Sequence, residues 1–270
     1  MTAARRRTER VVFSLPRIKR ETFVRQAELH RTIDSTNTRA MELAALESTK
    51  LPLLVLTENQ TAGRGRGSNV WWSAPGALTF SLALDLSGND TSPESWPRYA
   101  LASAVAVCDA LESFAPDASF GIRWPNDVCH GLQKICGILP ELCMAQAPRL
   151  VLGVGINANN TTSAAPAELR DSATSLFDLT RRRSNVTALL IAVLRQLESR
   201  FNALAAADPA LSRSWSTRCL LRDKTVRIAF DDIETEGRCA GIDADGALLL
   251  STTSGQQRFY GGTLSYISVS

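Results

Sequence analysis

Apolar residues along this chain gather in short blocks that polar and glycine-containing segments separate. Residues 51–57 (LPLLVLT) and 77–84 (ALTFSLAL) are nearly all apolar over a length typical of a buried strand. Residues 150–156 (LVLGVGI) are apolar on both faces, which indicates a central strand of a sheet. Two further strands are predicted over residues 120–124 and 135–142.

Three segments have the apolar spacing of an amphipathic helix. One begins near Thr36, with Ser35 or Thr36 as its N-cap, and continues through Ala44. The others cover residues 96–114 and 185–204. Strands and helices alternate loosely, and some strands follow one another directly. We therefore expect an α/β (α+β) fold, with a mixed β-sheet and helices packed on it, rather than a doubly wound sheet.

The pattern changes after Asp223, where five short alternating runs follow one another and Asp245-Gly246 marks a tight hairpin. These runs predict a small C-terminal β-barrel over residues 220–270. Residues 1–22 have little periodic apolar content and are predicted to be a basic N-terminal arm, which leaves residues 23–219 as the main domain. The five runs are 225–230, 233–242, 247–252, 257–260 and 264–269.

Composition excludes several classes of protein. The 270 residues are 44% hydrophobic and 21% charged, which is ordinary globular composition and not that of a disordered, collagen-like or coiled-coil chain. No apolar run approaches the roughly 20 residues that a membrane helix needs, so no membrane contact is expected. The apolar run Val11–Leu15 is too short for a signal peptide, and although an arginine-rich transit segment stays open, we expect a cytoplasmic protein.

The cysteines and histidines do not have the spacing of a metal site. None of the six cysteines lies in a C-x-x-C pair, and His30 and His130 form no ligand pair with each other. We therefore predict no protein-bound metal and six buried thiols. The chain also lacks G-x-S-x-G, which argues against a Ser–His–Asp hydrolase.

The net charge of +3 comes from one end of the chain. Residues 1–31 carry nine arginines and lysines against three glutamates, so the remaining residues are slightly acidic. The basic arm, together with the glycine–arginine loop at residues 60–73 described below, is also compatible with a nucleic-acid-binding module, which is a rival function.

The strongest candidate for chemistry is the glycine loop that follows the strand at 51–57, with the sequence QTAGRGRGSNVWWS over residues 60–73. Its alternating glycines (Gly63, Gly65 and Gly67) let the backbone approach a ligand closely. Arg64 and Arg66 add permanently charged, forked donors that suit carboxylate or phosphate. The loop matches neither a P-loop nor a dinucleotide-binding fingerprint. It is interpreted as a loop for a doubly anionic ligand, against the alternatives of a flexible surface loop or an RNA-binding fragment.

Two further segments are weaker candidates when taken alone. Arg123-Trp-Pro-Asn-Asp127 reads as a strand end and turn, and Lys134 starts the returning strand, where it could face the arginines of the loop. Gly153-Val-Gly-Ile-Asn157 is a buried strand that ends in glycines and Asn157. Taken alone, the first segment is better explained as turn structure with a solvated edge lysine, and the second could equally be a tight strand end.

Taken together and in this order, the segments resemble the biotin–protein ligases. The resemblance rests on S-T-N at 35–37, Q-T-A-G-R-G-R-G at 60–67, W-P-N-D at 124–127, K-x-x-G-I-L at 134–139 and G-x-G-I-N at 153–157, and it covers about residues 23–270. It implies an SH3-like C-terminal domain. It also implies an activity: biotin and ATP form biotinyl-5′-AMP, and biotin then passes to one lysine of a biotin carboxyl carrier protein.

The resemblance also implies roles for individual residues. Ser35, Thr36, Asn37 and Gln60 would contact the ureido end of biotin. Gly63, Arg64, Gly65 and Arg66 would form the loop over the carboxylate and the α-phosphate, with Lys134 beside them. Trp71 would lie near the adenine, Asn126 and Asp127 would hold the nucleotide side and Mg²⁺, and Asn157 would lie near the nucleotide. Where many members have a further arginine after the loop, this chain has Asn69, which affects the expected nucleotide contacts.

Partners and rival activities follow from the same resemblance. Some members also repress transcription through an N-terminal DNA-binding domain; Ser35 comes too early to leave room for one, so we expect no DNA binding and no repressor role. A lipoate or octanoyl ligase on a related fold is a second rival, although the G-R-G-R-G loop argues against it. The chain could be a monomer or a homodimer.

Overall fold

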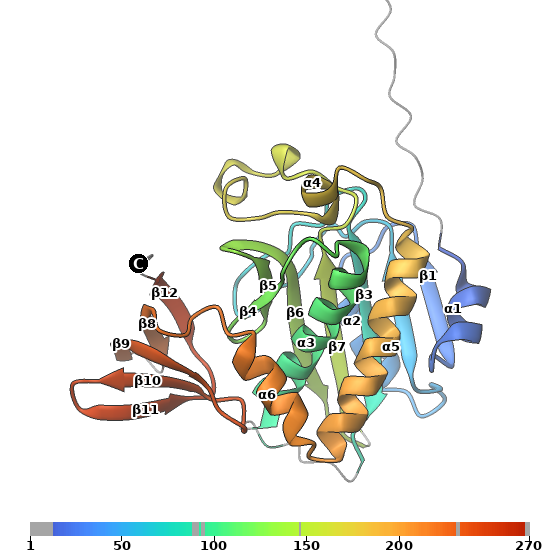
Figure 1. Ribbon diagram of the computed structural model, residues 1–270. Coiled ribbons are helices and arrows are strands. Elements are labelled where there is room, and N and C mark those ends of the chain that lie inside the picture. Colours follow the sequence, from blue (N-terminus) through green and yellow to red (C-terminus); the bar gives the residue numbers. More distant parts are fainter. Residues whose placement is uncertain (1–12, 88–91, 93–94, 146, 231–232, 268–270) are drawn as a thin grey trace, which may run out of the picture.

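The computed structural model describes residues 13–87, 92, 95–145, 147–230 and 233–267. Figure 1 shows two β-sheets side by side, a larger one covered by helices and a smaller one formed by the end of the chain. The larger sheet has seven strands in the order β1-β2-β3-β7-β6-β5-β4. Its strands are β1 (Gln26–His30), β2 (Leu53–Thr57), β3 (Leu78–Asp85), β4 (Gly121–Arg123), β5 (Asp127–His130), β6 (Gln133–Cys143) and β7 (Arg149–Ile156).

This sheet is mixed, as the sequence predicted. β1 pairs with β2 in parallel, whereas the other neighbouring strands are antiparallel. The longest registers join β3 to β7 and β7 to β6, and they place the most apolar segments at the centre. A central strand is buried on both faces, which explains why residues 150–156 lack alternation.

The two faces of the sheet carry different helices. Along β2, Leu54 and Leu56 join the large core under α3 (Trp96–Phe114) and α5 (Val186–Ala205), whereas Leu53 and Val55 join a small core under α2 (Thr36–Ala44). Because strand side chains alternate between faces, α2 lies on the face opposite α3 and α5. Figure 1 shows α3 and α5 side by side across their face. The short α2 covers only part of its own face and leaves the rest for a site.

Helix starts follow the local sequence. The Ser35 side chain caps α2 by accepting from the backbone N–H of Thr38, and Asn185 caps α5 by accepting from Ala188 at 3.0 Å. The α3 helix begins with Trp96-Pro97 and is rich in alanine, which lets it pack closely on α5.

Several elements were not predicted from the sequence. Part of the expected arm forms α1 (Leu15–Glu21), whose Ile18 is fully buried in the main core, so residues 15–21 are not a loose segment; residues 1–12 lie outside the described part of the chain. Strands β1 and β5 and helices α4 (Leu176–Thr180) and α6 (Pro209–Thr217) were also missed. These elements are short, and neither β1 nor β5 shows the clear alternation that predicts a strand.

The C-terminal strands form a five-stranded antiparallel sheet in the order β11-β10-β9-β8-β12. In the residues described, β11 and β12 are its two ends and do not pair, so the sheet is open rather than the closed barrel expected. Trp124 and Trp215 join it to the rest of the protein, because their indole N–H groups donate to the carbonyls of Gly246 and Asp243 at 3.0 and 2.9 Å. The strands are β8 (Thr225–Phe230), β9 (Ile233–Ile242), β10 (Leu248–Thr252), β11 (Gly255–Phe259) and β12 (Thr263–Ile267).

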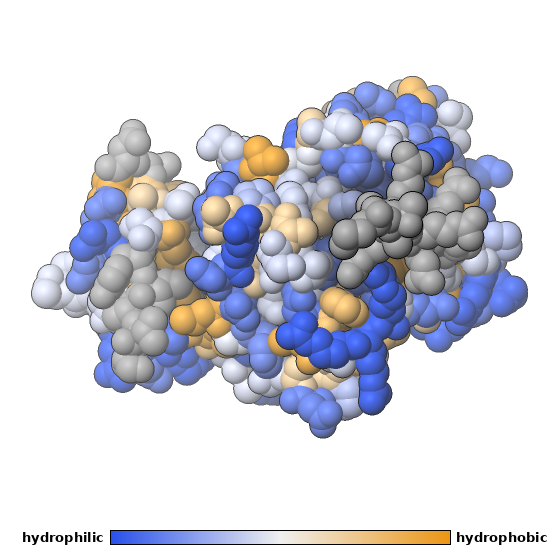
Figure 2. Space-filling view, turned by 90° about the horizontal axis from the view of Figure 1, so that it is seen from above, coloured by the Kyte–Doolittle hydropathy of each residue, from blue (hydrophilic) through white to orange (hydrophobic). Residues whose placement is uncertain are grey.

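Few large apolar side chains are exposed in the described part of the chain. On the face seen in Figure 2, hydrophobic residues form small separate spots among hydrophilic ones. Within the part of the chain that the structure describes, no helix is both long enough and apolar enough to cross a membrane.

Candidate active site

A cavity of about 480 Å³ lies on the sheet face that α2 covers only in part. Its floor is formed by small residues of β6 and β7, Gly137, Gly153 and Gly155, which belong to the same face as the small core under α2. The glycine loop covers it, and Thr263 and Leu264 from the C-terminal sheet complete its wall. Residues from both sheets therefore enclose one space.

One end of the cavity, the polar end, is lined by Ser35, Thr36, Asn37 and Gln60, and the fully buried Ser81 lies behind them. The Gln60 amide oxygen accepts from the backbone N–H and the hydroxyl of Thr36 at 2.7 and 3.0 Å. The Ser81 hydroxyl lies 2.6 Å from Oδ1 of Asn37 and 2.8 Å from Oγ1 of Thr36. These side chains carry no charge and hold one another in fixed orientations.

The middle of the cavity is a flat apolar slot formed by Trp71. A Cβ atom at Gly155 would come within 2.3 Å of the Trp71 indole, and one at Gly137 within 3.2 Å of the same ring. Glycine is therefore required for the ring to lie on the sheet. Within the described structure, the buried Trp71 Nε1 and Thr79 Oγ1 have no hydrogen-bond partner, and both residues line the cavity.

The other end, the charged end, is formed by Arg66, Arg123, Asp127 and Lys134. The Lys134 ammonium lies 2.6 Å from Oδ1 of Asp127, and Arg123 lies 2.9 Å from Oδ2 of the same carboxylate. Lys134 also lies 5.7 Å from the centre of the Trp71 ring. With three cations and one anion, this end carries a net positive charge that suits an anionic ligand.

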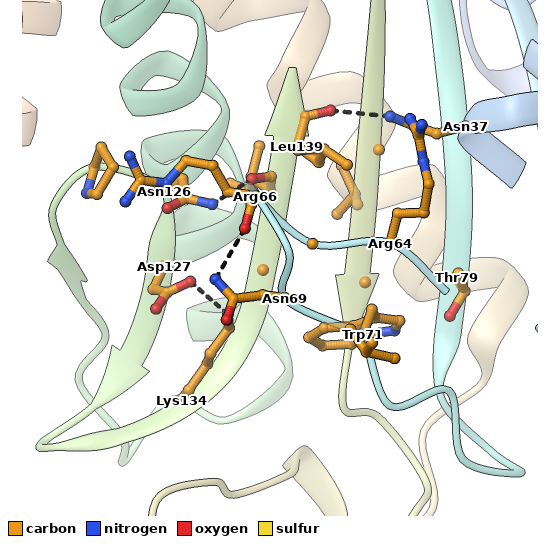
Figure 3. A pocket seen from close by; sticks show the side chains of 18 of the residues that line it. Asn37, Arg64, Arg66, Asn69, Trp71, Thr79, Asn126, Asp127, Lys134 and Leu139 are labelled. Atoms are coloured by element: carbon orange, nitrogen blue, oxygen red, sulfur yellow. Dashed lines mark hydrogen bonds and ion pairs between the residues drawn. The ribbon is translucent and has the colours of Figure 1, made fainter. Parts of the chain in front are cut away.

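Figure 3 shows the two ends on opposite sides of the cavity, with Asn37 and Thr79 on one side, Asp127 and Lys134 on the other, and Trp71 between them. Asn126 lies with the charged end, where its Nδ2 donates to the carbonyl of Ile138 at 2.6 Å.

Burial affects the ionisable groups around the charged end. Removal from water lowers the pKa of Arg66, and attraction to Asp127 works in the opposite direction. Burial raises the pKa of Cys136, behind Lys134, well above its usual value, and that of Cys129 to about 11. Both thiols are therefore protonated and are unsuited to act as nucleophiles.

The glycine loop folds back on itself as a short hairpin. Trp71 N–H donates to the carbonyl of Gly63 at 2.9 Å, and Gly65 N–H donates to that of Asn69 at 2.8 Å. The two arginines of the loop point to different partners: Arg64 pairs with Glu141, and Arg66 donates to the backbone carbonyl of Gly262, in the turn that precedes β12. The sequence placed both arginines beside Lys134. The structure instead places Arg64 toward the polar end, because the Glu141 carboxylate lies there.

The structure brings most of the predicted site residues to this one cavity. Gly63 and Asn157 do not line it: Gly63 serves the loop hairpin, and the Asn157 side chain accepts from Asn160 at 3.0 Å. The residues that do line it are Ser35, Thr36, Asn37, Gln60, Arg64, Gly65, Arg66, Trp71, Asn126, Asp127 and Lys134.

Other lining residues were not predicted from the sequence. Thr263 and Leu264 come from the C-terminal sheet, and Leu169, Ser172 and Ala173 come from the segment that precedes α4. Glu141, which bonds two cavity residues, lies two positions beyond Leu139 on the same face of β6. Strand alternation from Gly137 through Leu139 could have identified it.

No dedicated metal centre is present in the described residues, where no group of three or more His, Cys, Asp or Glu side chains is gathered. The oxygen donors at the charged end are the Asp127 carboxylate and the Asn126 amide. Such donors suit Mg²⁺, which usually binds through one or two carboxylates together with substrate phosphates. The residues therefore fit a magnesium ion that arrives with a nucleotide.

A positively charged end, a glycine–arginine loop and an adjoining C-terminal sheet together form a site that suits anionic substrates. Comparison with known proteins gives the family. Residues 29–157 match the biotin/lipoate A/B protein ligase family, and residues 223–265 match the biotin protein ligase C terminal domain.

Individual relatives agree with these matches. The chain is 32% identical over 256 residues to the bifunctional ligase/repressor BirA of Bacillus subtilis, covering 90% of this chain and 74% of that protein. It is 31% identical over 229 residues to the biotin–[acetyl-CoA-carboxylase] ligase of Mycobacterium tuberculosis, covering 84% and 83%. The solved biotin protein ligase from Aquifex aeolicus, in complex with biotin and ATP, has a TM-score of 0.78 at 25% identity and covers 89% of this chain and 98% of that chain. The chain belongs to the biotin protein ligase family, and it is a ligase.

Proposed function

We propose that this protein joins biotin to ATP as biotinyl-5′-AMP, releases pyrophosphate, and then transfers biotin to one lysine of a biotin carboxyl carrier protein. The observation that carries the proposal is the cavity itself, in which a polar end lined by amides and hydroxyls and a positively charged end are separated by the Trp71 slot. Biotin has the same sequence of groups: a ureido ring, an apolar body and chain, and a carboxylate.

The polar end matches a ureido group. A ureido group offers one carbonyl acceptor and two N–H donors. Because its amide oxygen is used by Thr36, Gln60 has its Nε2 group as a donor, and Ser35 has a hydroxyl proton to donate. Asn37 Oδ1 accepts from Ser81 with one lone pair and has a second lone pair that can accept a ureido N–H. Donors and acceptors are thus available for both kinds of ureido atom.

The charged end fits a carboxylate that meets a phosphate. In the first step a carboxylate oxygen of biotin bonds to the α-phosphorus of ATP, and the bond to pyrophosphate breaks. Two anions must approach each other, and Lys134 and Arg66 would lower the cost of that approach and stabilise the charge that builds on the α-phosphate. Holding both substrates in one cavity also removes the entropy cost of their encounter.

Asp127 has a second role in this proposal. It bonds Lys134 and Arg123 at once, which keeps the lysine at a defined point of the cavity. Asp127 and Asn126 are the residues that would hold Mg²⁺ on the nucleotide side. The ion, when bound with ATP, would supply further neutralisation of phosphate charge.

In the second step the ε-amine of the carrier lysine attacks the carbonyl carbon of the adenylate, AMP leaves, and the amine loses a proton as the amide forms. This route needs no enzyme nucleophile. That agrees with Cys129 and Cys136, whose raised pKa values keep both thiols protonated. Ordering of the glycine loop would protect the adenylate from water between the two steps.

The polar end argues against a lipoate or octanoyl ligase. An aliphatic chain placed there could bond neither the second lone pair of Asn37 Oδ1 nor the Nε2 group of Gln60, which is unfavourable. A cytoplasmic location, a monomeric or dimeric state and the absence of DNA binding remain predictions from the sequence.

Biotin-dependent exchange of labelled pyrophosphate into ATP tests the proposal. Purified protein with ATP and Mg²⁺ should catalyse exchange when biotin is added, and should not do so with lipoate or octanoate. Exchange that depends on lipoate or octanoate instead of biotin would favour the rival ligases, and no exchange with any acid would contradict the proposed adenylation.

A further inference from the structure

Glu141 bonds two cavity residues that come from different parts of the chain. Its Oε2 accepts from Nδ2 of Asn37 at 2.7 Å and also pairs with Arg64 of the glycine loop. The sequence motifs assign Glu141 no role. Its side chain is 29% exposed, whereas Asn37 is buried. The carboxylate therefore lies at the rim of the polar end, between the helix that carries Asn37 and the loop that covers the cavity.

The first contact fixes the orientation of the Asn37 amide. An asparagine side chain can turn over and exchange its oxygen and nitrogen, and the neighbouring groups decide which orientation is stable. Carboxylate and carbonyl oxygens only accept, so Glu141 and the Leu139 carbonyl, at 3.3 Å, both require Nδ2 to face them. Oδ1 must then point to the other side, where the Ser81 hydroxyl lies 2.6 Å away.

This orientation sets the direction of the neighbouring hydrogen bonds. The Ser81 hydroxyl has a single proton, and because an amide oxygen only accepts, that proton goes to Asn37. The Thr36 hydroxyl then donates either to Ser81 or to Gln60. If the Asn37 amide turned over, its NH₂ group would face Ser81 and its oxygen would face the Glu141 carboxylate. The polar end would lose its acceptor for a ureido N–H.

The second contact links the same carboxylate to the covering loop. Arg64 belongs to the glycine loop, and its pair with Glu141 is the bond by which this part of the loop reaches β6. Gly153, opposite Leu139 on the neighbouring strand β7, supplies the space for this arrangement, because a Cβ atom there would come within 2.4 Å of Asn37 Oδ1.

We propose that Glu141 is a positioning residue for biotin recognition: it holds the Asn37 amide in the orientation that accepts a ureido N–H, and through Arg64 it holds the glycine loop over the same end of the cavity. The inference rests on the proposed function, since it takes biotin as the occupant. It concerns recognition of the acid and not the adenylation chemistry at Lys134.

Calorimetric titration of biotin without ATP tests it, with Asn37→Ala, Glu141→Ala and the double variant. Glu141→Ala should weaken biotin binding about 10-fold or more, as expected for a lost orienting hydrogen bond to a charged group. In the Asn37→Ala background, Glu141→Ala should cost much less, because the residue through which it acts is absent. Glu236→Ala is the matched control, because Glu236 also pairs with an arginine but lies on the C-terminal sheet outside the cavity.

The experiment distinguishes failure of the proposed function from failure of the role of Glu141. If the unaltered protein binds no biotin, the proposed function fails. If it binds biotin and Glu141→Ala binds equally well, or loses the same factor with and without Asn37, the positioning role is contradicted. Should Glu141→Ala fail to fold, Glu141→Gln replaces it. Glutamine keeps one acceptor oxygen but lacks the charge that pairs with Arg64, so its biotin affinity should fall between those of the unaltered protein and Asn37→Ala. Affinity equal to that of the unaltered protein would also contradict the role.

Discussion

Lys134 and Asp127 form an ion pair of 2.6 Å at the charged end of the cavity, on neighbouring strands of the same sheet. The lysine is therefore held in place before any substrate arrives. A preorganised cation of this kind contributes to catalysis because it does not have to be repositioned as negative charge develops.

Lys134→Ala should slow adenylation by about 100- to 1,000-fold, the usual cost of removing a group that stabilises transition-state charge. Biotin affinity should change little, because the polar end on the far side of the cavity is intact. Pyrophosphate exchange measures the first effect and calorimetry the second, with Lys50→Ala, an exposed lysine outside the cavity, as the control. An unchanged exchange rate would remove Lys134 from the mechanism.

Gly155→Ala should abolish tight biotin binding while the protein stays folded. The new methyl group would come within 2.3 Å of the Trp71 indole and force the ring off the sheet. A loss of about 100-fold in affinity is expected when the slot is lost, as for a misplaced major contact. Gly261→Ala is the control, because its methyl group would meet only the exposed ring of Phe230, at 3.2 Å. Equal biotin affinity in the two variants would show that the slot does not bind biotin.

Arg66→Ala should let the adenylate escape. Arg66 donates to the carbonyl of Gly262, which joins the glycine loop to the C-terminal sheet across the cavity. Without that bond the loop should open more often, so free biotinyl-5′-AMP should accumulate severalfold faster when no carrier is present. Chromatography of the released nucleotide measures it, with Arg227→Ala as an arginine control on the C-terminal sheet. If Arg66→Ala released biotinyl-5′-AMP no faster than the unaltered protein does, the bond to Gly262 would not be what keeps the loop closed over the adenylate.

The sequence predicted the large elements well because their apolar patterns are long. The helix at 96–114 and the strands at 77–84 and 150–156 match α3, β3 and β7 within a residue at each end. Ile18 could not be placed in the same way: one buried residue in a seven-residue helix gives no period, and α1 packs on α5, which is distant in sequence.

The sequence could predict those residues of the site that belong to a recognisable motif. The motifs that contain Asn37, Gln60, Asp127 and Lys134 meet at one cavity. Sequence could not show that Arg64 faces the polar end, because that depends on where the Glu141 carboxylate lies in β6. Nor could it place Thr263 at the cavity wall, since the relation between the two sheets is set by tertiary contacts such as the bond from Trp124 to Gly246.

Ile18→Ala should lower the free energy of unfolding by about 2–4 kcal/mol, the usual cost of truncating a fully buried isoleucine. Lys19→Ala, one position further along the same helix and exposed, should change it by less than about 0.5 kcal/mol. Urea unfolding of the two variants compares them directly. Equal stabilities would mean that α1 does not belong to the core.

Cys219 should react with iodoacetamide at a lower pH than an ordinary cysteine thiol does. Its pKa is lowered because the thiol of Cys239 and the backbone N–H groups of Leu221 and Arg222 donate to its sulfur, which outweighs the opposing effect of burial. A lowered pKa means that the reactive thiolate persists to a lower pH than in an ordinary cysteine, and that it is lost as the pH falls further. Cys239→Ala removes the first of these donors and should move the midpoint of the pH profile upward. Mass spectrometry of the labelled peptide gives the profile, and a midpoint that Cys239→Ala does not move would exclude the pairing.

The central claim is that biotin passes through an adenylate to a carrier lysine. The measurement that tests it most directly is the intact mass of a biotin carboxyl carrier domain after incubation with this protein, biotin, ATP and Mg²⁺. The proposal predicts one added biotin per carrier, no addition when the acceptor lysine is replaced by arginine, and none on a lipoyl domain. A carrier that keeps its mass under saturating substrates, or a lipoyl domain modified in its place, would contradict the claim.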